Sequence, residues 1–345
     1  MAGAWAAGLT LLLASCSAGP AVPVPNSQVT SPVPAASAPA NAVSTAQVGQ
    51  SPAAGVPGQT NPEAARASDC ATIGDGAAEN AQKFGGILRA ANPPTPPARG
   101  APAYFLDVPP NVKSPATILL ALHGLGGNGQ DFAGPLVRLS RANGWLLVAP
   151  TIPYLDYDNV LEARADEAQL LPKLESIIDD VPRRSRVAVS RRILGLGFSR
   201  GAGLLQRFAM THPDRLAGMA LASSGGNTLP FSCAVRAGST VAMELPFPLG
   251  IAGFSQSTAR EFDAAAFRTI PIWMAVGGKD IGEATPWGGT LGANRLERNG
   301  AYAAALRKFG STVEFKTFPE LAHEITGGEI EEAVAALRSF LPKAP

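Results

Sequence analysis

The stretch of this chain that decides its fold lies at residues 193–203 and reads Ile193-Leu194-Gly195-Leu196-Gly197-Phe198-Ser199-Arg200-Gly201-Ala202-Gly203. Its apolar first half predicts a buried strand, and the apolar spacing after it predicts a helix. A serine on the sharp turn between them exposes its hydroxyl, and small residues two positions away on either side let the turn close. The turn also aims free N–H groups of the helix N-terminus at that hydroxyl. We therefore predict that Ser199 is a nucleophile; the alternative is a glycine-rich structural turn with a solvated serine.

A serine hydroxyl needs a base to remove its proton, so a histidine must accompany it. The chain holds three histidines, His123, His212 and His323. His212 ends the helix that Ser199 begins, roughly 20 Å along the helix axis, and His123 opens a glycine-rich loop whose backbone is its useful part. His323 lies between the last predicted strand and the last predicted helix. By elimination and position, we predict that His323 is the base.

The base in turn needs a carboxylate that fixes its tautomer and stabilises the imidazolium. An apolar run at 271–276 ends in the turn Gly277-Gly278-Lys279-Asp280, with an acid at its tip. Asp280 thus falls between the serine and the histidine in chain order. We predict that Asp280 orients the base. Glu283 is the alternative acid, and capping of the next segment is the alternative role of Asp280.

A second glycine-rich loop follows the apolar run at 118–122 and reads His123-Gly124-Leu125-Gly126-Gly127-Asn128-Gly129. Such a loop lets backbone N–H groups approach a developing oxyanion, and one such donor contributes ~3–4 kcal/mol. We predict that the donors are the N–H groups of Leu125 and of Arg200, which directly follows Ser199. A phosphate-binding loop would require Gly-x-x-x-x-Gly-Lys-Ser/Thr, which is absent, and a dinucleotide fold would require its ribose-binding acid.

The four motifs together resemble those of the α/β-hydrolase superfamily. Within it, the run from Leu122 through the second loop to Asp131-Phe132 is most similar to the branch of polyhydroxyalkanoate depolymerases, feruloyl esterases and phospholipase/carboxylesterase relatives. The resemblance extends from about Tyr104 to the C-terminus. It departs at Arg200, where the depolymerases usually have a small or amide residue, and at Val189-Ser190, where that branch often has an acid. It implies a serine esterase that forms an acyl-enzyme intermediate and needs no cofactor or metal.

The order of predicted elements favours the same fold independently. Apolar strand patterns recur at 104–108, 118–122, 145–149, 193–196, 218–222, 272–276 and 313–318, and helical patterns at 132–141, 165–178, 201–210, 294–309 and 329–341. This alternation predicts the α/β class, with a mostly parallel sheet covered by helices on both faces. Loops that follow parallel strands gather at one edge, where such folds bind ligands. All four motifs lie on such loops.

Two segments are candidates for substrate contacts. Residues 225–268 are too many for an ordinary connection, and apolar residues persist there between prolines and glycines, which predicts a cap-like insertion over the site. Phe231 and Phe247 would then line an acyl or aromatic pocket; alternatively, the segment shields the sheet edge. The loop after the 145–149 strand offers Tyr154 and Tyr157 as further contacts.

The N-terminus has the pattern of an exported protein. Residues 6–15 form an apolar run that is too short to span a bilayer but typical of a signal peptide, here assigned to 1–15. The run ends at Leu13-Ala14-Ser15-Cys16, which resembles the bacterial lipobox and implies lipidation of Cys16. Residues 16–67, rich in Pro, Ala and Ser, predict a disordered tether before a catalytic domain at 68–345. We expect an extracytoplasmic protein whose membrane contact is the lipid anchor alone; secretion is the alternative.

Cysteine count and charge indicate which covalent cross-link and which kinds of partner to expect. Besides Cys16 the chain has Cys70 and Cys233, for which an oxidising compartment favours a disulfide over two free thiols. The 28 basic and 27 acidic residues give a net charge of +1 and are dispersed, which argues against a nucleic-acid partner. No Cys/His cluster has metal-site spacing. We expect an ester substrate, with a polyester depolymerase or feruloyl-type esterase as alternatives and a catalytically silent binding domain as the alternative of another class.

Overall fold

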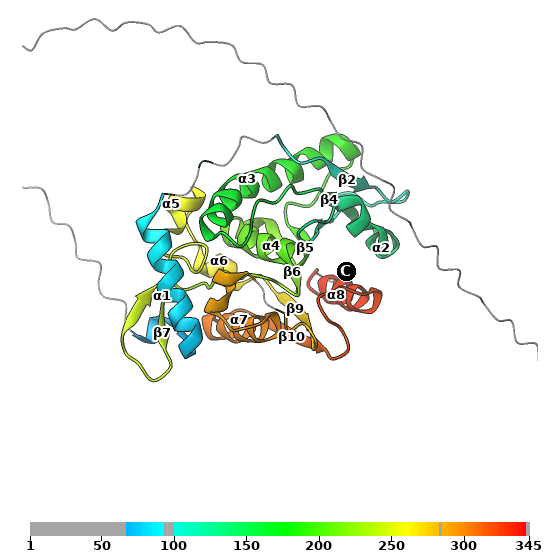
Figure 1. Ribbon diagram of the computed structural model, residues 1–345. Helices are drawn as coiled ribbons and strands as arrows, with labels where there is room; N and C mark the ends of the chain where they lie inside the picture. The colour runs from blue at the N-terminus through cyan, green and yellow to red at the C-terminus, as the bar shows by residue number, and fades with distance from the viewer. Residues whose placement is uncertain (1–66, 93–94, 96–99, 283–284, 343–345) are drawn as a thin grey trace, which may run out of the picture. The chain divides into compact units, whose positions relative to one another are not determined.

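A sheet in the order β10-β9-β6-β5-β3-β4-β2 forms the centre of the computed structural model (Figure 1). Its strands are β2 (Tyr104–Asp107), β3 (Ile118–Leu122), β4 (Leu146–Pro150), β5 (Ile193–Phe198), β6 (Leu216–Ala222), β9 (Ile272–Gly277) and β10 (Val313–Phe318). All neighbouring strands pair in parallel except β2 and β4, which pair antiparallel at one edge. The seven strands expected from the sequence are therefore present, with ends that differ by at most two residues.

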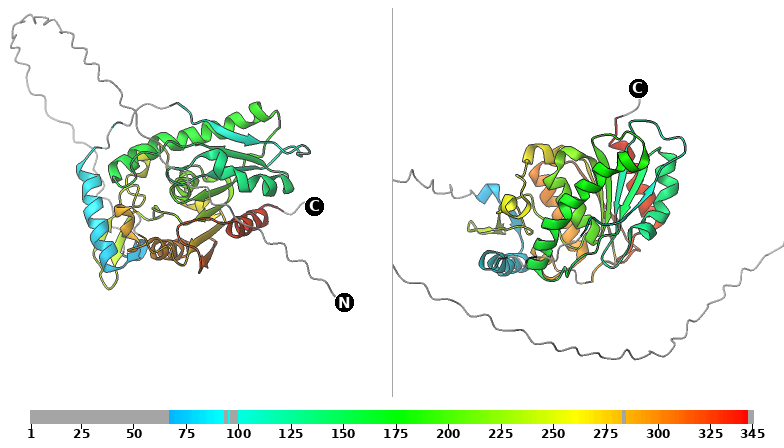
Figure 2. Two further views of the ribbon diagram at one scale, coloured as in Figure 1. Left: turned by 45° about the vertical axis from the view of Figure 1, so that its right-hand side comes forward. Right: turned by 90° about the horizontal axis from the view of Figure 1, so that it is seen from above.

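Helices cover both faces of this sheet (Figure 2). They are α2 (Gly129–Ala142), α3 (Val160–Ser185), α4 (Arg200–Thr211), α7 (Arg295–Phe309) and α8 (Gly327–Ser339). Side chains of α3, α4 and α7 pack in one apolar cluster with alternate residues of β3, such as Leu120 and Leu122. Those of α2 and α8 pack in a second cluster with the intervening residues Leu119 and Ala121. The alternation follows from the two-residue period of a strand, and it confirms the predicted α/β architecture.

The structure describes residues 67–92, 95, 100–282 and 285–342, all within the compact unit Thr60–Pro345. The expected signal peptide, the lipidation site Cys16 and nearly all of the expected tether lie outside these residues. Among the helices that are described, none has both the length and the apolar character needed to cross a bilayer.

A small second sheet lies beside the main one and was not predicted. It pairs β1 (Ala71–Ile73) in parallel with β7 (Cys233–Arg236), which pairs antiparallel with β8 (Ala242–Glu244). The remaining elements are η1 (Ala67–Asp69), α1 (Asp75–Ala90), η2 (Pro213–Arg215), α5 (Phe254–Thr258), α6 (Ala264–Arg268) and η3 (Pro286–Thr290). The disulfide expected between Cys70 and Cys233 is present. It fastens the segment before β1 to the start of β7.

Removing this disulfide is expected to destabilise the domain substantially. The bridge spans 163 residues of sequence, and closing so long a loop restricts the unfolded chain, an effect worth about 3–5 kcal/mol. We expect a Cys70→Ser/Cys233→Ser variant to lose that much free energy of unfolding in urea titrations. A reducing agent should destabilise the parent protein and leave the variant unchanged. Equal midpoints for the two proteins would contradict the prediction.

Candidate active site

Ser199 sits on a strained turn between β5 and α4. Its backbone has φ 53° and ψ −116°, a combination that non-glycine residues rarely adopt and that is typical of functional sites. The backbone leaves no room for a side chain at either flanking glycine. A Cβ on Gly197 would lie 2.6 Å from the carbonyl oxygen of Gly201, and one on Gly201 would lie 2.2 Å from that of Leu122. The turn therefore depends on a glycine on each side and holds the serine at the carboxyl end of the sheet.

The three residues predicted as a triad meet in one hydrogen-bonded chain. Ser199 Oγ lies 2.9 Å from His323 Nε2, and His323 Nδ1 lies 2.9 Å from Asp280 Oδ2. An ionised carboxylate only accepts, so Nδ1 carries the proton and Nε2 is left to accept from the serine hydroxyl. The Phe198 ring stacks on the imidazole with a centroid distance of 5.1 Å. These contacts fix both the tautomer and the plane of the ring.

Asp280 and His323 are brought together by two adjacent parallel strands. Asp280 ends the turn after β9, and His323 lies in the loop after β10. Lys279 N–H donates to the carbonyl of Leu321 at 2.9 Å, and a Cβ on Gly277 would meet the carbonyl of Ala322 at 2.3 Å. The two loops therefore pack backbone against backbone, which only a glycine at this position allows.

The Asp280 carboxylate is buried, with 1% of its side chain exposed, and has a second partner. Arg295 Nη1 donates to Oδ1 at 3.1 Å, while Oδ2 accepts from His323. Burial alone would raise the pKa of Asp280. The hydrogen bond and charge of His323 and the guanidinium of Arg295 outweigh burial and hold that pKa below its ordinary value. Asp280 is therefore ionised at neutral pH.

The glycine-rich loop after β3 is held by the His123 side chain. His123 is buried, its Nε2 accepts from the N–H of Ile152 at 2.9 Å, and its Nδ1 donates to the carbonyl of Gly124 at 2.7 Å. Burial lowers the pKa of His123, so the ring stays neutral in this arrangement. Both Leu125 and Arg200 line the pocket at Ser199.

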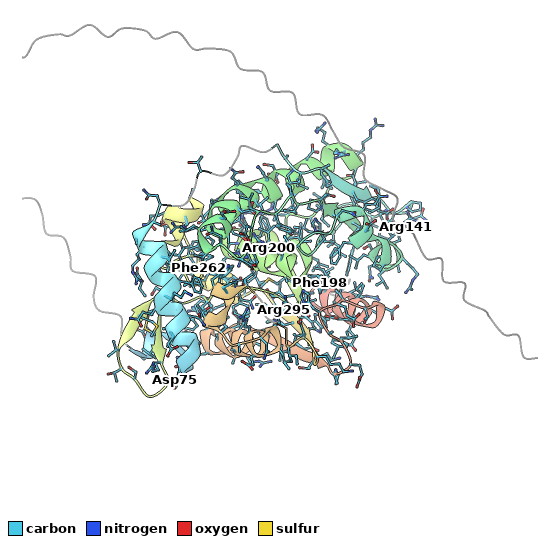
Figure 3. The ribbon with its side chains drawn as sticks, in the orientation of Figure 1. Asp75, Arg141, Phe198, Arg200, Phe262 and Arg295 are labelled. Atoms are coloured by element: carbon cyan, nitrogen blue, oxygen red, sulfur yellow. A yellow bond between two sulfur atoms is a disulfide. The ribbon has the colours of Figure 1, made fainter. Side chains whose placement is uncertain are left out.

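The Arg200 side chain, labelled in Figure 3, is buried in an ionic cluster. Its guanidinium pairs with Glu167 and with Asp166, and it lies between the rings of Tyr154 and Tyr157, at 4.8 and 4.0 Å. Arg207 Nη2 binds the same Glu167 carboxylate at 2.8 Å. Burial would raise the pKa of Glu167, but the two arginines outweigh it and lower the pKa. The arginine at this unusual position therefore ties the nucleophile's turn to α3.

The pocket in front of Ser199 has a volume of about 550 Å³. It is lined by Gly124, Leu125, Tyr157, Asp158, Phe198, Ser199, Arg200, Gly225, Thr285, Pro286, Arg295 and His323. Of the four aromatic residues expected to contact substrate, only Tyr157 lines it. Tyr154 instead donates its hydroxyl to the carbonyl of His123 at 3.0 Å, and so supports the glycine-rich loop from behind.

Phe231 and Phe247 lie away from this pocket, contrary to expectation. Phe231 lines a separate cavity of about 360 Å³ between β1 and α7. Phe247 is fully buried and packs edge-on against Phe254. Of segment 225–268, only Gly225 lines the pocket at the serine. The expected pocket contacts of Phe231 and Phe247 are therefore wrong, and the segment instead supplies β7 and β8 of the small sheet.

Arg295 and Glu329 are polar residues of the site region that the sequence did not single out, whereas Asp158 lies on the loop that offered Tyr154 and Tyr157. Arg295 and Asp158 line the pocket, and Arg295 binds Asp280. Within the described ranges, no group of three or more His, Cys, Asp or Glu side chains has an arrangement that would hold a metal ion. The sequence predicts a helix that begins at Asn294, and so places Arg295 in its first turn. The contact of Arg295 with Asp280, 15 residues earlier in the chain, is visible only in the folded structure.

Glu329 is expected to make stability depend on pH. Its side chain is buried near the start of α8, and neither carboxyl oxygen has a hydrogen-bond partner among the described residues. Burial, reinforced by the charges of Asp280 and Glu324, raises its pKa from 4.5 to about 7. The folded state therefore favours the protonated acid. Stability is fully present below pH 4.5 and falls by about 2–3 kcal/mol as the pH rises through 7.

A Glu329→Gln variant removes this titration without changing the side chain's shape. Urea unfolding should give the variant and the parent similar stability at pH 4.5, and a more stable variant at pH 8. The exposed Glu331 on the same helix supplies the matched control, because Glu331→Gln should leave the pH dependence unchanged. A Glu329→Gln effect of the same size at both pH values would contradict the prediction.

Comparison with known proteins bears on the fold. No protein-family model matches the sequence, and no curated protein matches it. Among solved structures, poly(aspartic acid) hydrolase-1 from Sphingomonas sp. KT-1 is similar with a TM-score of 0.53 and 20% identity, over 68% of this chain and 92% of that one. The LpqC poly(3-hydroxybutyrate) depolymerase from Bordetella parapertussis is similar with a TM-score of 0.50 and 16% identity, over 68% and 80%. Together with the sheet order and the helices on both faces, these likenesses show that the chain has the α/β-hydrolase fold.

Proposed function

We propose that the protein is a serine hydrolase that cleaves carboxylic esters through an acyl-enzyme intermediate. The observation that carries the proposal is the continuous chain from Ser199 Oγ through both nitrogens of His323 to a buried carboxylate. This is the arrangement that turns a weak hydroxyl nucleophile into an active one. It stands beside an open pocket at the carboxyl edge of the sheet, where α/β folds bind ligands.

The reaction follows from the proton positions. His323 Nε2 takes the hydroxyl proton while Ser199 Oγ forms a bond to the ester carbonyl carbon. The carbonyl oxygen becomes an oxyanion, which the N–H groups of Leu125 and Arg200 stabilise. The imidazolium, held by Asp280, then gives its proton to the leaving alcohol as the carbon–oxygen bond breaks. Water repeats the sequence on the acyl-enzyme and releases the acid and free Ser199.

The substrate and location are narrower proposals. A polyester or a feruloyl-type ester is a candidate substrate, and the former is supported by the fold likeness to a poly(3-hydroxybutyrate) depolymerase. The Cys70–Cys233 disulfide supports an oxidising, extracytoplasmic compartment. Export through residues 1–15, lipidation at Cys16 and a tether to residue 67 complete the proposed arrangement, with the catalytic domain at 68–345.

Labelling with a fluorophosphonate tests the proposal, because this probe modifies only activated serines. We expect the native protein to be labelled and peptide mass mapping to place the adduct on Ser199. Heat-unfolded protein should not be labelled. Absence of labelling in the native protein would favour the silent binding domain instead. Clearing of a polyester emulsion, compared with turnover of short soluble esters, then separates a depolymerase from a simple esterase.

A further inference from the structure

Arg295 places a cation with unused hydrogen-bond donors in the pocket at the nucleophile. It begins α7 and lines the pocket together with Ser199 and His323, with 19% of its side chain exposed. A guanidinium has five N–H donors. Among the residues that the structure describes, the Asp280 carboxylate is the only hydrogen-bond partner of this guanidinium, through Nη1. Its Nε is buried without a partner.

The charge balance of the lining distinguishes Arg295 from the other arginine there. The Arg200 side chain is 1% exposed and is neutralised by Glu167 and Asp166 behind the pocket. Arg295 instead shares one carboxylate, Asp280, with the catalytic histidine. When His323 becomes an imidazolium, Asp280 faces two cations and can neutralise one. Among the described residues, nothing else therefore neutralises the charge of Arg295 fully while His323 is protonated.

We infer that Arg295 binds a carboxylate of the substrate and so selects esters that carry one near the scissile bond. Guanidinium and carboxylate match in shape and form charge-assisted hydrogen bonds. Hemiesters of dicarboxylic acids carry the carboxylate on the acyl side, and esters of hydroxy acids carry it on the alcohol side. The inference rests on the proposed function, since it concerns the specificity of the same site.

One charge in the pocket opposes this preference. Asp158 lines the same pocket and is exposed, so it repels an anionic substrate. Replacing it with asparagine should raise the preference for anionic esters by roughly two- to fivefold, the range of an exposed charge interaction. The two pocket charges thus act in opposite directions, and variants of them should shift the preference in opposite directions.

Paired substrates that differ by a carboxylate in place of a methyl group test the inference. Monomethyl adipate against methyl hexanoate varies the charge of the acyl part, and 4-acetoxybenzoate against 4-methylphenyl acetate varies that of the alcohol part. In at least one pair, the ratio of kcat/KM, anionic over neutral, should fall at least ~10-fold in Arg295→Gln, mainly through KM. Arg295→Lys should keep part of the ratio, because it keeps the charge and loses the planar fork. Comparing ratios between proteins cancels the intrinsic reactivity of the esters.

The outcomes separate three cases. Rates will fall for neutral esters too in Arg295→Gln, because Asp280 loses a partner, so the ratio is the decisive quantity. Unchanged ratios in both pairs, with equal losses on all four esters, would overturn the inference and leave Arg295 as a positioning residue for Asp280. Failure of the parent protein to hydrolyse any of the four esters would instead overturn the proposed function, and this inference with it.

Discussion

Replacing Ser199 with alanine is expected to lower kcat for p-nitrophenyl esters by roughly 10⁵- to 10⁶-fold. Among the residues that the structure describes, the Ser199 hydroxyl is the group that contacts His323 Nε2, at 2.9 Å, and Ser199 lines the pocket. Without it no acyl-enzyme forms, and the remaining oxyanion donors and binding contacts act only on a water molecule. A panel from acetate to palmitate measures the loss and, in the parent protein, relates chain length to the size of the pocket.

The folded structure should survive this change. Alanine, like serine, carries a single Cβ substituent at φ 53°, and among the described residues the hydrogen bond lost is the one to His323. Ser176→Ala is the matched control, since its exposed hydroxyl bonds the carbonyl of Pro172 on α3. That variant should keep full activity. Retention of more than about a tenth of the parent activity by Ser199→Ala would contradict the assignment.

The main sheet was predictable because parallel strands covered on both faces consist of continuous apolar runs. β3 matches its expected range, Ile118–Leu122, residue for residue. The small sheet was not predicted because its strands lack such long apolar runs. β1 and β8 each have three residues, too few to display a period, and β1 pairs with β7, more than 160 residues later in the chain.

The residues of the candidate site likewise include some that the sequence could predict and some that it could not. The proximity of Ser199, Asp280 and His323 was predictable because chain order and strand-end position constrain them, and parallel strands bring such loops together. The placement of Phe231 and Phe247 was wrong because apolar character predicts burial but not which cavity the residue fills. Arg200 departs from the pattern of the branch that the sequence resembles; its partner Glu167 lies 33 residues earlier in the chain and is adjacent only in the fold.

Replacing Asp280 with asparagine is expected to lower kcat by about 10⁴-fold at neutral pH. The native carboxylate accepts at both oxygens, from His323 Nδ1 and from Arg295 Nη1. An asparagine has one oxygen and one NH₂ group, and Arg295 can only donate, so the oxygen turns to Arg295. The NH₂ group then faces His323 Nδ1, which must accept. The proton moves to Nε2, where it blocks removal of the proton from Ser199.

Measurement of kcat for a neutral p-nitrophenyl ester checks this expectation, with fluorophosphonate labelling as a second readout that should slow in parallel. Asp214→Asn makes the same chemical change in an exposed ion pair with Arg191 and should keep full activity. A Glu would retain the charge, so Asp280→Glu should retain more activity than Asp280→Asn wherever its longer side chain still reaches His323. Near-parent activity in Asp280→Asn would mean that His323 keeps its tautomer without the carboxylate. That outcome is unfavourable because Arg295 can only donate, and it therefore attracts the asparagine oxygen away from the histidine.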